Sequence, residues 1–403
     1  MSARTPQRRS CLVVAEEVWG SPLHAARSLD RIGVDALVAV AGEGAAIVGS
    51  SRACAAAVDL DPSDPVRFCS DLVAWAEARS PGGHVVPVIP LGDRLVEILD
   101  GNRSRFPDRF RLAVAAPEVN EVLLDKVRSL EVAHRAGINV PAWAHVRSAD
   151  DLGPVADLRL PLIVRPTSWA TTGSEYFKFQ VLREPGRVDT ELRAALDRGA
   201  ELLVQEYLEV PEDAVELALT WRSADGGRTA VCTGRKRRAS ARTGGVMAWG
   251  EAVDLPDVRA AAERFLDASG HTGPGGLEVI RHDGRLWFVE FNPRLEAIHF
   301  LGTAAGIDTV RLTYEDLSGA APSTVPGQRP ASAWIGSAWL NRVRADPAAV
   351  REALAARWEF ARSDNAVRAV WDPRDPRPGL AVARRILRQF RSRGSATTTG
   401  PHP

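Results

Sequence analysis

The sequence lacks several features that would assign it to particular classes of protein. Its four cysteines show no CxxC and no metal-ligand spacing, so we interpret them as reduced residues of a cytoplasmic protein. No apolar run is long enough to span a membrane, and the run behind the basic N-terminal tip is too short for a signal peptide. The formal net charge of the 403 residues is zero, which argues against nucleic acid as the main partner.

Lysine is also scarce. Of the 51 basic residues only Lys126, Lys178 and Lys236 are lysines, and the other 48 are arginines. A lysine that is retained in such an arginine-rich chain is a mild sign that an ammonium group is needed at that position. The three lysines are therefore candidates for a functional site.

The segment GGLEVIRHDGRLWFVEFNPR, from Gly275 to Arg294, combines oxygen ligands with an arginine. It is predicted to form two short strands joined by a tight turn. Its Glu278, Glu290 and Asn292 are oxygen donors of the kind that Mg²⁺ prefers, and a cation beside an arginine suits the handling of phosphate charge. The alternative from this segment alone is a solvent-facing hairpin with ordinary surface glutamates.

The length of the turn decides whether these oxygen donors share a face of the hairpin. Side chains alternate along a strand, so Glu290 and the asparagine two residues later lie together. A two-residue turn at Asp283-Gly284 would send Glu278 to the opposite face, whereas a three-residue loop that begins at His282 would bring all three donors together. Glycine at the third loop position suits a type I turn closed by a bulge, so we expect the three-residue loop.

The remaining pattern predicts an α/β protein. Alternating strands and helices at the start indicate a parallel sheet covered on both faces, without the GxGxxG of a dinucleotide site. One helix is expected over 118–136. Strands follow at LPLIVRP, KFQVL and LLVQEYL, then an antiparallel pair, VELALTW and TAVCTGR, and a basic loop, RKRRASARTGGVMAWG. The chain becomes rich in proline and arginine near residue 325, where a small C-terminal α/β unit is expected.

Five motifs in this order resemble the ATP-grasp superfamily. They are LLDKVRSLEVAHRAGINVP, PLIVRP with its polar loop, LLVQEYLEVPED, GGLEV and FVEFNPR, and they fall within residues 10 to 320. The closest resemblance is to carboxylate–amine ligases of the carboligase and dipeptide-ligase type. It implies an α/β ATP-grasp fold with an N-terminal Rossmann-like domain and a small C-terminal extension. The implied parts are a disordered tail (1–10), the N-terminal domain (11–115), the small lid part (116–205), the large part with the metal site (206–325), and a C-terminal subdomain with a loose tail (326–403).

The resemblance assigns several residues to the phosphates of ATP. Lys126 matches the first ATP-contacting lysine of the family. Arg165 stands where the family usually has a second lysine, a departure that still leaves a forked phosphate donor. The polar loop 167–174 corresponds to the glycine-rich phosphate loop but contains only Gly173. Lys178, which follows it, is either a further phosphate contact or an ordinary strand lysine.

The same resemblance implies an adenine site. QEYL, from Gln205 to Leu208, matches the hinge that recognises adenine through backbone groups, with Glu206 as a side-chain acceptor. Either Glu209 or Asp213 would hold the ribose hydroxyls, and the sequence does not choose between them. The alternative is an edge strand with surface acids.

Glu278, Glu290 and Asn292 match the family's ligands for two Mg²⁺ ions, for which Mn²⁺ would substitute. Arg294 matches the catalytic arginine beside the transferred phosphate and the developing oxyanion.

Candidates on the substrate side are weaker. Lys236 lies in a charge run that is usually a solvated face, although alternation on a strand would turn it toward the nucleotide. Gly244 and Gly245 are candidates for a substrate lid. His299 would either line the acceptor pocket or pack in the core.

The chemistry implied is the ligation of a carboxylate to an amine. The carboxylate attacks the γ-phosphate of ATP to give an acyl phosphate and ADP, and the amine then displaces phosphate. We expect small-molecule partners such as an amino acid or a peptide-like acid, in a biosynthetic pathway, with no nucleic acid and no membrane. The oligomeric state stays open, with dimers common in the family. The alternatives are carboxylation, phosphoryl transfer to another acceptor, or a non-catalytic nucleotide-binding scaffold.

Overall fold

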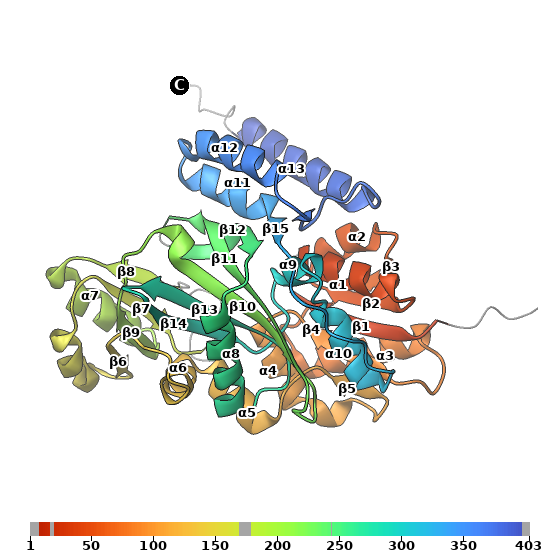
Figure 1. The fold of residues 1–403 in the computed structure, drawn as a ribbon, viewed down its shortest axis with the longest axis horizontal. Helices are drawn as coiled ribbons and strands as arrows, with labels where there is room; N and C mark the ends of the chain where they lie inside the picture. The colour runs from red at the N-terminus through yellow and green to blue at the C-terminus, as the bar shows by residue number, and fades with distance from the viewer. Residues whose placement is uncertain (1–7, 17–19, 169–178, 243, 397–403) are drawn as a thin grey trace, which may run out of the picture.

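The computed structural model describes residues 8–16, 20–168, 179–242 and 244–396. These residues form three β-sheets with helices packed around them (Figure 1). One sheet belongs to the N-terminal part of the chain, a small sheet to the middle, and a long sheet to the second half. The α/β architecture predicted from the sequence is confirmed.

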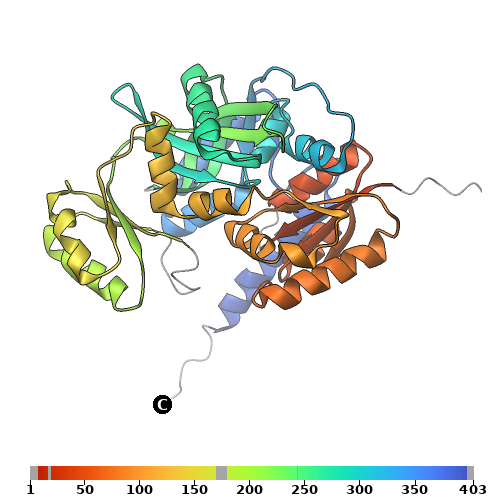
Figure 2. The ribbon, with the colours of Figure 1, turned by 90° about the horizontal axis from the view of Figure 1, so that it is seen from below.

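The N-terminal sheet is parallel and has the strand order β3-β2-β1-β4-β5. Its elements are β1 (Ser10–Ala15), α1 (Gly20–Arg31), β2 (Asp35–Val40), α2 (Gly44–Gly49), β3 (Cys54–Val58), α3 (Pro65–Arg79), β4 (Val86–Pro90), α4 (Asp93–Gly101), the 3-10 helix η1 (Arg103–Arg105) and β5 (Phe110–Leu112). Alternate residues of β1 enter different cores: Cys11 and Val13 join the core that contains α1, whereas Leu12 and Val14 join the one that contains α3 and α4. Helices on both sides (Figure 2) explain the unbroken apolar run of this strand.

Two helices stand where the sequence predicts one over 118–136, so that prediction is wrong. They are α5 (Pro117–Leu124) and α6 (Lys126–Arg135). Asp125 breaks the helix because it is extended and caps α6, its carboxylate accepting the N–H of Arg128 at 2.9 Å. The break places Lys126 in the first turn of α6, and its N–H donates to the Thr167 carbonyl at 2.9 Å.

The middle sheet has the antiparallel order β6-β9-β7-β8. Its elements are β6 (Trp143–Val146), the 3-10 helix η2 (Ala149–Asp157), β7 (Leu162–Pro166), β8 (Gln180–Leu182), α7 (Pro185–Leu196) and β9 (Leu202–Glu206). Val164 and Val204 pack on the face covered by η2 and α7. Side chains alternate, so Arg165 and Gln205 project from the other face. Leu203 of that face joins a core of the long sheet, which shows that the two sheets pack together there.

The long sheet has the order β14-β13-β10-β11-β12-β15-β16. Its elements are the 3-10 helix η3 (Glu212–Ala214), β10 (Val215–Arg222), β11 (Thr229–Ala241), β12 (Gly244–Ala252), α8 (Pro256–Ser269), β13 (Gly273–His282), β14 (Arg285–Asn292), α9 (His299–Ala304), α10 (Thr309–Ser318), β15 (Ala331–Trp334) and β16 (Ala366–Arg368). The expected basic loop RKRRASARTGGVMAWG is instead the paired ends of β11 and β12. Arginine and lysine stems suit a half-buried strand, which composition alone did not reveal.

The C-terminal part extends the long sheet through β15 and β16 and adds α11 (Gly336–Ala345), α12 (Ala349–Ala361) and α13 (Arg377–Ala396). Arg342 of α11 is 2% exposed and pairs with Glu212 at 2.8 Å and with Glu352 at 2.9 Å. Because both carboxylates face the same guanidinium, this network joins α11 and α12 to Glu212, which lies just before β10. Among the described residues, no helix has the length and apolar character that a membrane crossing requires.

We predict that Arg342→Ala lowers the free energy of unfolding by about 3 kcal/mol, because it removes the buried guanidinium shared by Glu212 and Glu352, of which only Glu352 keeps another ion-pair partner, Arg238, among the described residues. Arg344→Ala is the matched control, since Arg344 is exposed on the same helix. Urea denaturation of both variants measures the difference, and equal stability would contradict this account of the network.

Candidate nucleotide and metal site

The turn of the hairpin β13–β14 has two residues, so the predicted three-residue loop is wrong. His282 pairs with Arg285, and Asp283 and Gly284 have φ of 49° and 73°. Positive φ at both central positions is the geometry of a type I′ turn, for which Asp-Gly is a preferred sequence. The dipeptide therefore indicated the turn type directly.

A β-bulge nevertheless brings the three oxygen donors to one face. The register shifts after Val279, which pairs with Phe288, so that Glu278 pairs with Glu290 rather than with Val289. The extra residue restores the alternation that the two-residue turn would have inverted. Gly276 pairs with Asn292 two residues on, and all three donors therefore share a face.

The bulge is held by the middle sheet. The guanidinium of Arg165 donates from Nη1 to the Val289 carbonyl at 3.1 Å and from Nη2 to the side-chain oxygen of Gln205. Burial lowers the pKa of Arg165, with Glu290 acting in the opposite direction. The residue expected to hold phosphate thus also fixes the strand that carries Glu290.

Lys236 lies beside the oxygen donors, so the structure places it at the candidate site. Its ammonium is 2.7 Å from the Glu278 carboxylate and donates to the Gly245 carbonyl at 3.4 Å. Burial opposes the charge of Lys236, but Glu278 and, farther away, Glu290 raise its pKa above the ordinary value. The strand β11 therefore supplies a cation to the same face as the hairpin ligands.

Glu296 is a site residue that the sequence reasoning missed. Its carboxyl lies against Gly276, where an added Cβ would be 1.5 Å from Oε1. This oxygen is buried and has no hydrogen-bond partner among the described residues. Burial, followed by the charge of Glu278, raises the pKa of Glu296 to about 8. The glycine at 276 is the only signal in the sequence, because any larger residue would occupy this space.

Arg294 connects the hairpin to the N-terminal sheet. Its Nε is 2.7 Å from a carboxylate oxygen of Asp93, and its Nη2 donates to the side-chain oxygen of Asn292 at 3.3 Å. Burial opposes ionisation of Arg294, but Asp93 raises its pKa above the ordinary value. Asp93 opens α4 directly after β4, and its role in the site was not predicted.

A cavity beside the hairpin contains Lys126, Asp93, Glu97, Glu290 and Asn292. Burial lowers the pKa of Lys126 and so does the nearby guanidinium of the middle sheet, while Glu290 and Asp93 act in the opposite direction. The structure therefore brings the first lysine of the expected ATP site to the expected metal ligands, although they lie far apart in the sequence.

The expected adenine hinge lies at the end of β9. Gln205 is engaged by the arginine of β7, and Glu206 accepts the backbone N–H of Arg159 at 3.0 Å. Leu208 lies just beyond the strand. Of the two ribose candidates, Glu209 pairs with an arginine, Arg183, whereas Asp213 is exposed in η3. Lys178 and most of the phosphate loop, including Thr171, Thr172, Gly173 and Ser174, lie outside the described residues.

His299 is in the core rather than on a cavity. It is fully buried at the start of α9, and its Nδ1 accepts the Glu296 N–H at 2.8 Å. Burial lowers its pKa to about 3, so the ring is neutral at physiological pH. Gly244 and Gly245 begin β12 with φ of 127° and 103°, values that strongly favour glycine, and only Gly245 contacts Lys236.

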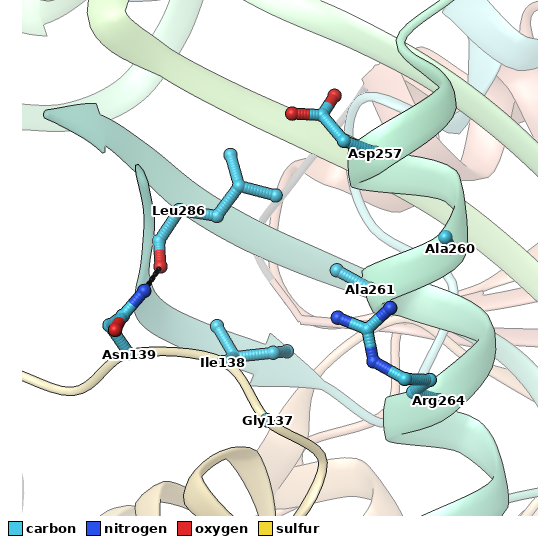
Figure 3. Close-up of a pocket in the computed structure, with 8 residues that line it drawn as sticks. All are labelled: Gly137, Ile138, Asn139, Asp257, Ala260, Ala261, Arg264 and Leu286. Carbon is cyan, nitrogen blue, oxygen red and sulfur yellow. Dashed lines mark hydrogen bonds between the residues drawn. The ribbon is translucent and has the colours of Figure 1, made fainter. Parts of the chain in front are cut away.

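A second groove lies on the other side of the hairpin (Figure 3). It is bounded by Ile138, Asn139, Leu286 and helix α8, and Asn139 donates from its side chain to the Leu286 carbonyl at 2.9 Å. It contains none of the candidate ligands. The convergence of charged groups, rather than the presence of a hollow, therefore locates the site.

In the part of the chain that the structure describes, no three His, Cys, Asp or Glu side chains are gathered as a closed metal cluster. The candidate set is two carboxylates and an amide. These donors suit a hard cation, and the Glu296 carboxyl, whose raised pKa favours its protonated form, lies near them.

The pH dependence of stability tests the burial of Glu296. Its folded pKa is above the value of an unfolded chain, so the protonated carboxyl favours the fold and this contribution is lost as pH rises from about 5 to about 8. We expect the stability of the wild type, measured against Glu296→Gln by urea denaturation, to fall across that range. The exposed Glu263→Gln is the control, and parallel curves for wild type and Glu296→Gln would rule out a buried carboxyl.

Comparison with known proteins places this geometry in context. No protein-family model matches the chain, and no curated protein matches it. Solved structures do. N5-carboxyaminoimidazole synthetase from Staphylococcus aureus, complexed with ADP, has a TM-score of 0.60 and 12% identity over 81% of this chain and 82% of its own. The biotin carboxylase domain of the Hydrogenobacter thermophilus 2-oxoglutarate carboxylase, with MgADP and bicarbonate, has a TM-score of 0.60 and 17% identity over 80% and 73%.

An L-amino acid ligase from Bacillus licheniformis is similar to the same extent, with a TM-score of 0.58 and 16% identity over 81% of this chain and 79% of the ligase. At such identities the likeness is one of fold. The likeness agrees with the α/β ATP-grasp fold that the resemblance implied, in which a parallel N-terminal sheet is followed by mainly antiparallel sheets. The chain therefore has the ATP-grasp fold.

Proposed function

We propose that this protein is an ATP-dependent ligase that joins a carboxylate to an amine through an acyl phosphate. The observation that carries the proposal is the shared face of Glu278, Glu290 and Asn292, with Arg294 beside them. Two carboxylates and an amide suit Mg²⁺, and the arginine suits the charge of a transferred phosphoryl group. The solved structures that share this fold include enzymes named as ligase and as carboxylase, which supports ATP-dependent carboxylate chemistry.

Four cationic side chains take part in this proposal, two of them at the phosphates. Lys126 and Arg165 hold the α- and β-phosphates in line from α6 and β7. Arg294 stabilises the oxyanion at the acyl carbon, a contribution worth about 3 kcal/mol per lost donor. Glu278, Glu290 and Asn292 would hold Mg²⁺, which would supply positive charge beside the phosphates. Lys236 is close enough to Glu278 to compensate its charge before the metal–nucleotide complex binds.

The choice of an amine as acceptor follows from the chain itself. Its sequence shows nothing that suggests a biotin or bicarbonate partner. The five motifs point to the ATP-grasp superfamily as a whole, and within it the chain looks most like the carboligase and dipeptide-ligase group. In a ligase the acyl phosphate must be kept from water, and in this proposal the middle sheet, which contacts the hairpin through Arg165, closes over the site to exclude it. An amino acid or a peptide-like acid is the expected substrate class.

Glu290→Ala is expected to reduce Mg²⁺-dependent ADP formation by at least about a hundredfold, because it removes one of the proposed Mg²⁺ ligands. The assay is ADP and phosphate release in a screen of paired amino acids, with labelled acid and amine to identify the product. Glu131→Ala on the exposed face of α6 is the control. Undiminished ADP formation in Glu290→Ala would contradict the mechanism, and a carboxylated product would replace ligation by carboxylation.

Lys236→Met is expected to strengthen Mn²⁺ binding by about tenfold in the absence of nucleotide, because the ammonium no longer competes for Glu278. Titration of free Mn²⁺ by electron paramagnetic resonance measures this directly. The matched control is Arg235→Met, since its neighbour Arg235 pairs with Glu216 instead. Equal Mn²⁺ affinity in wild type and Lys236→Met would show that the buried ion pair does not occupy the metal position.

A further inference from the structure

The C-terminal cap, residues 326–396, has a charge that the proposed function does not use. It contains 14 arginines, no lysine and six acidic residues, a net charge of +8. Because the whole chain is neutral and residues 397–403 carry no Asp, Glu, Lys or Arg, residues 1–325 carry −8. Such an asymmetry usually indicates a partner of opposite charge.

Contacts with the rest of the chain do not neutralise the cap. Four of its acids pair with arginines outside it: Asp375 with Arg27, Glu352 with Arg238, Asp346 with Arg242 and Glu359 with Arg237. Only two of its arginines make such pairs with outside acids among the described residues, Arg342 with Glu212 and Arg385 with Glu43. Packing therefore uses up more of the cap's negative charge than of its positive charge, and leaves the outer surface more basic than the composition suggests.

The outer surface of the cap is formed by α12 and α13, which Figure 1 shows at one end of the molecule, beyond β15. Eight exposed arginines of the cap have no acidic partner among the described residues: Arg344, Arg351, Arg357, Arg362, Arg374, Arg377, Arg384 and Arg388. Helix α13 contains six arginines and no acid along its 20 residues.

The cap also exposes large apolar side chains. Leu354 and Trp358, each 64% exposed, are one turn apart on α12, and Leu380 and Leu387 are exposed on α13. Of the ten large apolar residues exposed in the described chain, six belong to the cap, so the apolar surface is concentrated where the basic surface is. The guanidinium of Arg362 stacks over Trp358 at 4.1 Å.

We propose that the outer face of the cap is a docking surface for an anionic membrane interface, in contrast to the expectation from the sequence that no membrane is a partner. Arginines bind lipid phosphates, and leucine and tryptophan side chains enter the boundary of the acyl chains. Neither signal suffices alone, and the cap presents both. A nucleic acid would satisfy the arginines but not Leu354, Leu380 and Leu387. A fluid interface also accommodates groups spread over two helices without a shaped partner. The contact is peripheral, so it is compatible with the absence of a spanning helix from the described residues.

Sedimentation of the full-length protein with vesicles tests the proposal, independently of nucleotide or activity. We expect binding to phosphatidylcholine mixed with an equal amount of phosphatidylglycerol, and none to phosphatidylcholine alone. Arg351→Gln with Arg384→Gln should weaken binding about 25-fold, at about fivefold per arginine. Leu354→Gln with Trp358→Gln should weaken it while leaving all eight arginines in place.

Val66→Gln with Arg67→Gln is the matched control, an exposed apolar and basic pair on α3, and it should bind as the wild type does. Circular dichroism verifies that each variant is folded. Failure of the wild type to bind anionic vesicles, or equal binding by all variants, would overturn the proposal. So would a dimer, detected by light scattering, that the cap substitutions dissociate while vesicle binding persists, because the surface would then belong to a second copy.

Discussion

The pairing of Glu278 with Glu290 across the hairpin is the constraint on which the rest of the site depends. A two-residue type I′ turn would by itself separate these side chains, and one extra residue, Val289, brings them back to a common face. The carbonyl of that residue is bound by Arg165, so the middle sheet stabilises the irregularity. The bulge in β14 is thus the point where the middle sheet, the long sheet and the oxygen donors meet.

Opposite charges are then balanced in pairs that come from different parts of the chain. Arg294 is matched by Asp93 of the N-terminal sheet, and Lys236 by Glu278 across the long sheet. The Lys236–Glu278 pair is buried and the Arg294–Asp93 pair is partly buried, and an isolated charge in such positions would be unfavourable. Glu296 has no such partner among the described residues and holds its proton instead. The charged groups are therefore paired before any ligand enters, and in the proposed function each partner released on binding becomes available to the nucleotide.

The sequence predicted the fold and most of the charged side chains of the site, because local patterns determine strands, helices and motif order. It predicted the wrong turn, because the Gly284 signal was attributed to a bulged loop while the bulge lies at Val289, where the sequence has no mark. Asp93 and Glu296 were missed for a different reason. Their roles arise only when distant segments meet, and no spacing rule connects a residue after β4 with one after β14. Asp125, by contrast, is a typical N-cap residue. The apolar spacing that continues across it nevertheless led to the prediction of a single helix.

The most direct test of the account is a crystal structure of the protein with Mn²⁺ and a non-hydrolysable ATP analogue, in which anomalous scattering locates the metal. We expect anomalous density between the carboxylates of Glu278 and Glu290 and the side-chain oxygen of Asn292, with the Lys236 ammonium moved from Glu278 to a phosphate. Density elsewhere, with the Lys236–Glu278 pair intact beside bound nucleotide, would contradict the assignment of this face as the metal site.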